Sequence, residues 1–176
     1  MPALAVAHPG HAEGLAVAAG ALHPLTGADH LAALLAVGAW STTLADRART
    51  WVPAAFLVAM GLGSALAPAL FVPAGVVEQG IAASLLLLGL LLAFQARLAA
   101  PATVGLAATF ALFHGAAHGL EAPGAAVGYT AGFLLASALL IAVGFAATTQ
   151  LTHRLRSKGL RIGGALLAGS GLLLLG

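Results

Sequence analysis

Charged and helix-breaking residues divide this sequence into apolar stretches, each long enough to form a membrane-spanning helix: residues 14–43, 52–70, 77–97, 102–121, 125–152 and 160–176. An α-helix needs about 20 apolar residues to cross the hydrocarbon core of a bilayer. Only 7% of the residues are charged, whereas soluble domains carry about 25%, so most of the surface must face lipid. The sequence predicts an all-α integral membrane protein with six transmembrane helices, folded as a single transmembrane domain over residues 1–176.

The connections between these stretches are short, so we expect sequential helices to be antiparallel neighbours. Six spans divide into two sets of three, and an odd number in each half makes the halves face opposite ways. This arrangement predicts a three-plus-three inverted repeat with a binding site between the halves. Glycine pairs at four-residue spacing, Gly115/Gly119 and Gly128/Gly132, are interpreted as chance in a chain with 23 glycines. Such small-residue helix faces also suggest a homo-oligomer.

Positive charge is confined to one side of the predicted bundle. The connections after spans one, three and five, with the ends of the adjoining spans, hold every Lys and Arg: Arg47, Arg49, Arg97, Arg154, Arg156, Lys158 and Arg161. The opposite side carries Glu13, Glu78 and Glu121. By the positive-inside rule, both termini are expected on the outer, periplasmic side of a bacterial-type inner membrane. The net charge of +2 comes from these loops, so no nucleic-acid partner is expected.

The first residues have part of the pattern of a secretory leader. Ala5-Val6-Ala7 has the small-x-small form of a signal-peptidase site, whereas the basic region and the long apolar region of a complete leader are missing. We therefore interpret residues 1–7 as the remnant of a signal peptide, with the natural N-terminus close to His8.

The first polar cluster lies in the first span, in the segment His23-Pro-Leu-Thr-Gly-Ala-Asp29-His30. On a continuous helix the two histidines are about 10 Å apart along the axis, which is too far for one metal ion. Pro24 and Gly27 predict a kink or an unwound turn that draws the imidazoles together. Asp29 is the acidic residue deep inside a span, and such residues usually face the bundle interior with a partner.

The second polar cluster lies in the fourth span, in Phe-His114-Gly-Ala-Ala-His118-Gly-Leu-Glu121. Residues four apart leave the same face of a helix, about 6 Å apart along the axis, so His114 and His118 can chelate one ion. Glu121 continues the same face near the outer mouth, as a further ligand or an attracting carboxylate.

Together the two clusters predict a metal site between spans one and four. The chain has no cysteine, so the ligands must be imidazole, carboxylate or carbonyl groups, which suit nickel, cobalt, zinc, copper(II) or manganese. The predicted ligands are His23, Asp29, His30, His114, His118 and Glu121. An outer capture site formed by His8, His11 and Glu13 and a plain solvated tail are equally compatible with the sequence. His153 is interpreted as a loop residue or a helix-helix hydrogen bond.

Both motifs, with Ala-Pro123 after the second, resemble the signature segments of the HupE/UreJ family of nickel/cobalt permeases. The resemblance covers nearly the whole chain, including the Ala-His8-Pro-Gly-His11 start. It implies secondary uptake of nickel or cobalt, and it implies that the six predicted ligands line the route. The broader nickel/cobalt transporter class carries a His-x4-Asp-His element, whereas the spacing here is one residue longer.

Two other functions remain compatible with the residues. Three histidines and an aspartate could hold the zinc of an intramembrane hydrolase, although Gly115 stands where a His-Glu-x-x-His element has its glutamate. Paired histidines could also bind haem in a membrane cytochrome. The favoured prediction is a transporter, not an enzyme, with no catalytic residue, no permanent cofactor, and a divalent ion as substrate. No phosphate-binding loop is present in the sequence.

Overall fold

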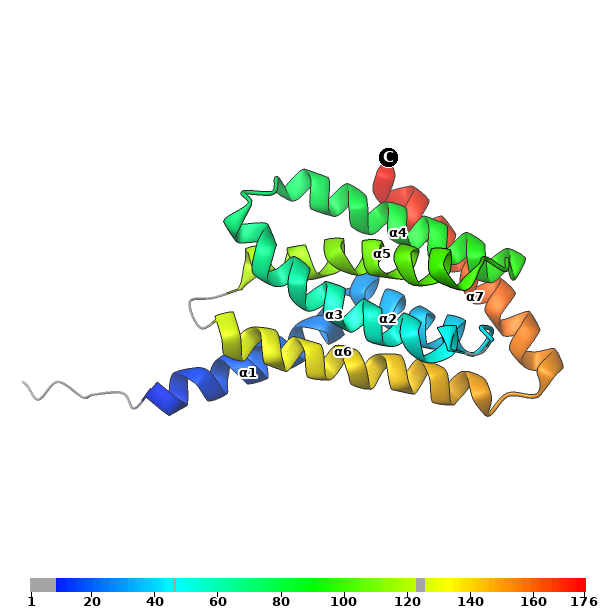
Figure 1. The fold of residues 1–176 in the computed structure, drawn as a ribbon, viewed down its shortest axis with the longest axis horizontal. Helices are drawn as coiled ribbons and strands as arrows, with labels where there is room; N and C mark the ends of the chain where they lie inside the picture. Colours follow the sequence, from blue (N-terminus) through cyan, green and yellow to red (C-terminus); the bar gives the residue numbers. More distant parts are fainter. Residues whose placement is uncertain (1–8, 46, 123–125) are drawn as a thin grey trace, which may run out of the picture.

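The computed structural model describes residues 9–45, 47–122 and 126–176, and these residues form seven α-helices (Figure 1). In chain order the helices are α1 Pro9–Thr26, α2 Ala28–Ser41, α3 Ala48–Ala69, α4 Ala74–Phe94, α5 Ala100–Glu121, α6 Ala126–Thr149 and α7 His153–Leu175. The predicted all-α class is confirmed. The five helices from α3 to α7 are long and apolar enough to cross a membrane, and residues Gly14–Thr26 form a shorter apolar helix.

The long first stretch is two helices because the chain turns at Gly27. This residue has extended backbone angles, with φ −89° and ψ 111°, and it caps the start of α2. Pro24 lies inside α1 and removes a backbone donor from its last turn. The carbonyl of His23 is satisfied locally, because it accepts the Thr26 hydroxyl at 2.8 Å and the Gly27 amide at 3.4 Å. The kinked first span expected from Pro24 and Gly27 is therefore present.

The start of α7 differs from the sequence prediction, which treated residues 153–159 as a connection. These residues form the first two turns of the helix. The charge of its Arg and Lys residues keeps this segment out of the hydrocarbon core. Because Arg and Lys are good helix formers, the segment is nevertheless helical. As a result, His153 opens a helix and does not lie in a loop.

The chain reverses direction after α2, α3, α4, α5 and α6, and three pairings of non-consecutive helices hold the bundle together (Figure 1). Helix α3 packs along α5, α6 packs along both α1 and α2, and α4 packs along α7. Helices α4 and α7 run antiparallel, whereas α3 runs parallel to α5, and α6 runs parallel to α1 and α2. The expectation that sequential helices are the closest neighbours is therefore wrong, because glycine-mediated contacts join helices that are not consecutive. The connections after α2, α4 and α6 lie at the same end of the bundle, which is on the right in Figure 1. The basic residues gather at this end, as expected from the sequence.

The interpretation of the glycine pair in α5 as chance is wrong. A side-chain carbon at Gly115 would overlap the backbone carbonyl of Met60, and one at Gly119 would overlap that of Ser64. The two glycines therefore let the backbones of α5 and α3 touch, which strengthens dispersion contacts between apolar helices in lipid.

The same close approach joins α6 to α1, where Gly132 lies against the backbone carbonyl of Val17. Gly115, Gly119 and Gly132 thus already pack against helices of the same chain. Their faces are not free for a second copy, so they give no support to the predicted homo-oligomer.

We expect Gly115→Ala to destabilise the protein, because one added carbon forces two touching backbones apart. Overpacking of this kind costs about 1–3 kcal/mol, which should lower the unfolding temperature measured in detergent. The matched control is Gly105→Ala on the same helix, where an added carbon meets no other atom within 4 Å. Equal unfolding temperatures for the two variants would contradict the packing described for α3 and α5.

Candidate metal centre

Four imidazoles from three helices meet in the interior of the bundle. His23 comes from the last turn of α1, His30 from the first turn of α2, and His114 and His118 from α5. The ring centroid of His30 lies 5.0 Å from that of His114 and 4.7 Å from that of His118. The His23 centroid lies 4.9 Å from that of His118. We refer to these four side chains as the imidazole cluster.

The turn at Gly27 makes this meeting possible. A continuous helix would separate His23 and His30 by about 10 Å along its axis. Across the turn their ring centroids are 6.2 Å apart. The change of direction therefore lets His23 and His30 both contact His118 of α5, while His30 also contacts His114.

The two predicted carboxylates flank the cluster. Asp29 Oδ1 lies 3.2 Å from Nδ1 of His30, and Glu121 Oε2 lies 2.9 Å from Nε2 of His23. The Asp29 side chain is 34% exposed and that of Glu121 is 57% exposed, so both carboxylates stand at the edge of the site. The structure thus brings all six predicted residues into one contiguous group.

Several ring nitrogens of the cluster have no partner. Both nitrogens of His118 and Nε2 of His30 are buried without a hydrogen bond, and the His118 residue is 0% exposed. Leaving a buried polar group unsatisfied costs about 1–3 kcal/mol. Each neutral imidazole has one nitrogen lone pair, so these rings offer buried electron pairs that nothing in the described part of the chain uses.

The ring of His118 is held by α6, which the sequence analysis did not associate with the site. Phe133 stacks on it with centroids 4.2 Å apart and planes at 15°. Tyr129 lies one turn away along α6, with its centroid 6.4 Å from that of His118. Stacking covers one face of the ring and restricts the plane in which its two nitrogens lie.

Ser84 of α4 is a further residue that the sequence analysis missed. Its hydroxyl donates to the carbonyl of Ile81 at 2.7 Å and lies 2.9 Å from Nε2 of His114. A hydroxyl has a single proton. When the Ser84 proton goes to Ile81, Ser84 accepts from Nε2–H of His114 and Nδ1 keeps the lone pair, so the direction of this bond and the tautomer of His114 are coupled. A serine among the leucines of a membrane span is the signal that could have identified it.

The rings contact one another edge to face, with interplanar angles from 63° to 83°. Within residues 9–45, 47–122 and 126–176, no three His, Asp or Glu side chains form a ready-made metal site. Metal-bound imidazole nitrogens lie about 2.0–2.1 Å from an ion such as zinc. Shared coordination would therefore need the rings to turn their lone pairs to one point.

The predicted outer capture site lies outside what the structure describes. His8 precedes the described residues, and the side chains of His11 and Glu13 in α1 are likewise not described. That site stays a prediction.

Comparisons with known proteins agree with the motif resemblance. A family model described as "HupE / UreJ protein" matches residues 1–174. Protein HupE of Rhizobium leguminosarum bv. viciae is 37% identical over 179 residues, which cover 99% of this chain and 92% of that protein. No solved structure matches the chain.

We expect Ser84→Ala to leave Nε2 of His114 buried without a partner. The loss should lower the free energy of unfolding by about 1–3 kcal/mol and release the ring from one tautomer, which nitrogen-15 NMR of labelled histidine reports. Ser170→Ala is the control, because the Ser170 hydroxyl bonds only to Leu167 in its own helix. An unchanged His114 tautomer in the Ser84 variant would contradict this role.

Proposed function

Since this chain belongs to the HupE/UreJ family, a family associated with nickel and cobalt uptake, we propose that it carries a divalent nickel or cobalt ion through the imidazole cluster. The protein is a multi-pass membrane protein. The observation that carries the proposal is the set of unpartnered ring nitrogens on His30 and His118. Buried lone pairs without a partner are costly, and coordination of a cation would satisfy them.

The proposed ligands are the four imidazoles, with Asp29 and Glu121 as the flanking carboxylates. Nitrogen and carboxylate donors without thiolate suit nickel and cobalt, and they would also accept zinc. The ion would replace the edge-to-face contacts between rings by bonds to their nitrogens. Ser84 and Phe133 would hold His114 and His118 during this exchange, since each contacts one ring from outside the cluster.

The pairing of helices supports six spans in an inverted repeat. If α1 and α2 together form span one, exchanging them with α5, α3 with α6, and α4 with α7 maps the pairings onto one another. Helix α3 on α5 becomes α6 on α1 and α2, and α4 on α7 maps onto itself. Inverted-repeat transporters commonly use a broken helix at the interface of the halves, and the turn at Gly27 supplies one here.

Charge supports a direction for the movement. All Lys and Arg lie at the end where α2, α4 and α6 finish, which the positive-inside rule assigns to the cytoplasm. Glu121 and Glu78 lie at the opposite end, where their charge would attract cations from the periplasm. The pair of Glu121 with His23 would then form the outer entrance to the cluster.

Two observations argue against the alternative functions, a zinc hydrolase and a haem-binding cytochrome. The HupE/UreJ family is a transporter family and not a family of enzymes, so the zinc hydrolase is no longer needed to explain the histidines. Haem would need an open slot between paired histidines, whereas the ring centroids in contact here are only 4.7 to 6.2 Å apart.

We expect His118→Ala to reduce nickel and cobalt flux into liposomes by at least about tenfold, because even groups that only support metal ligands alter affinity by about 10–100-fold. The control is Thr109→Ala on the same helix, whose exposed hydroxyl bonds only to the carbonyl of Gly105. Flux would be measured with a metal-sensing dye inside the vesicles. Wild-type flux in the His118 variant, with correct folding, would rule out the cluster as the route.

A further inference from the structure

Two cavities adjoin at the basic end of the bundle, and the larger one extends from there to Asp29 at the edge of the candidate metal centre. One is an apolar groove of about 1260 Å³ between α2, α4, α6 and α7, and the other is a smaller polar pocket of about 470 Å³. Arg156 and Leu160 of α7 line both cavities. The polar pocket and the apolar groove are therefore neighbours, with one arginine at their boundary.

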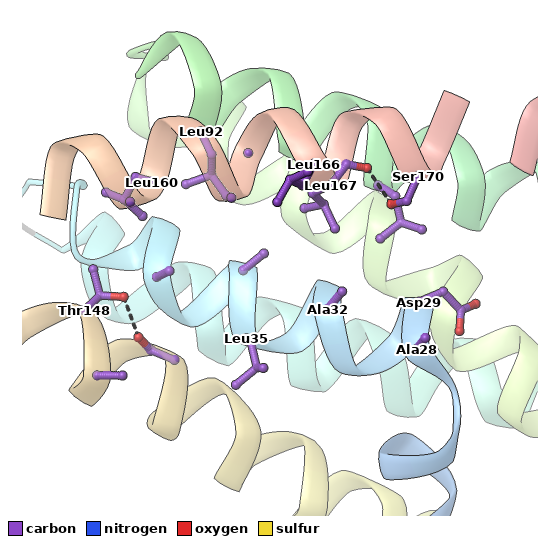
Figure 2. Close-up of a pocket in the computed structure, with 18 of the residues that line it drawn as sticks. Ala28, Asp29, Ala32, Leu35, Leu92, Thr148, Leu160, Leu166, Leu167 and Ser170 are labelled. Carbon is purple, nitrogen blue, oxygen red and sulfur yellow. Dashed lines mark hydrogen bonds between the residues drawn. The ribbon is translucent and has the colours of Figure 1, made fainter. Parts of the chain in front are cut away.

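The groove has the length of one acyl chain. Along α2 it extends from Ala28 to Ala39, which is about 16 Å at 1.5 Å per residue. One leaflet contributes about half of the roughly 30 Å hydrocarbon core. Figure 2 shows Leu160 and Thr148 at one end of the groove and Ala28 and Asp29 at the other. Most of its lining is Ala, Leu, Val and Gly, which suits a hydrocarbon chain and not a hydrated ion.

The polar pocket has the charge that a phosphate group requires. It lies where the chain leaves α2, leaves α4 and enters α7, and Arg97, His153 and Arg156 line it. Its described lining residues include no carboxylate, and neither arginine forms an ion pair within the described part of the chain. Gln95 joins α4 to α7 across this pocket by donating to the Ser157 hydroxyl at 2.8 Å.

We propose that this composite cavity binds an anionic phospholipid of the surrounding bilayer. The phosphate contacts Arg156 and Arg97 in the polar pocket, and an acyl chain extends along α2 toward Asp29. Basic pockets between membrane helices on the cytoplasmic side are known to bind acidic headgroups. A chain in this position covers the side of Asp29 that faces the groove, and it fills the space between α7 and α2. The proposal does not depend on metal transport.

The test uses the full chain in detergent, with phosphatidylglycerol or phosphatidylcholine added and detected by native mass spectrometry and by the shift in unfolding temperature. We expect phosphatidylglycerol to be retained and to stabilise the protein more than phosphatidylcholine does. Arg156→Gln should weaken its binding about fivefold, since one basic residue near an anionic headgroup contributes about 1 kcal/mol. Arg154→Gln is the matched control, because Arg154 lies two residues away, is exposed, and lines neither cavity.

A second variant tests the groove. Gly163 lines it, and a Cβ added there meets open space, so Gly163→Leu places a bulky side chain at the groove and should also reduce lipid retention. Equal binding of the two lipids, equal loss in the Arg154 and Arg156 variants, or full stabilisation by glycerol phosphate without acyl chains would each overturn the proposal.

Discussion

The extended turn at Gly27 is the constraint on which the arrangement of this site depends. It interrupts a stretch that would otherwise be one helix and places His23 and His30 on the two sides of the break, with ring centroids 6.2 Å apart. Without it, the two histidines would face α5 at different depths. The local sequence explains the turn, since Pro24 weakens the end of α1 and Gly27 begins α2 from an extended conformation.

Close backbone packing then decides which helices surround the turn. Gly115 and Gly119 bring α5 onto α3 on one face, while the adjoining face of α5 carries the histidines that meet α1 and α2. Gly132 brings α6 against α1 and so places Phe133 over His118. The position of the imidazole cluster is thus tied to contacts between backbones, which leave little freedom for the helices to slide.

The apolar helices, their alternating direction along the chain and both histidine motifs were readable from the sequence because each leaves a local pattern, whereas the pairing of α3 with α5 and of α6 with α1 and α2 was not. Length of apolar run, side of positive charge and four-residue spacing need no knowledge of the packed structure. Ser84 and Phe133 were not found, because which face of α4 or α6 meets α5 depends on how the helices rotate against each other. The start of α7 was misjudged because its charged residues signal an end of the hydrocarbon core and equally suit a helix.

The chemistry of the site rests on buried lone pairs that a cation can use, with α4 and α6 holding the rings in place. X-ray absorption spectroscopy at the nickel edge of the nickel-loaded protein tests this most directly, because imidazole rings give a distinctive outer-shell signal. We predict several imidazole nitrogens around one nickel ion at about 2.0–2.1 Å, the range of nitrogen ligands on zinc. A nickel ion surrounded by oxygen alone, with no imidazole scattering, would contradict the assignment of the cluster as the metal site.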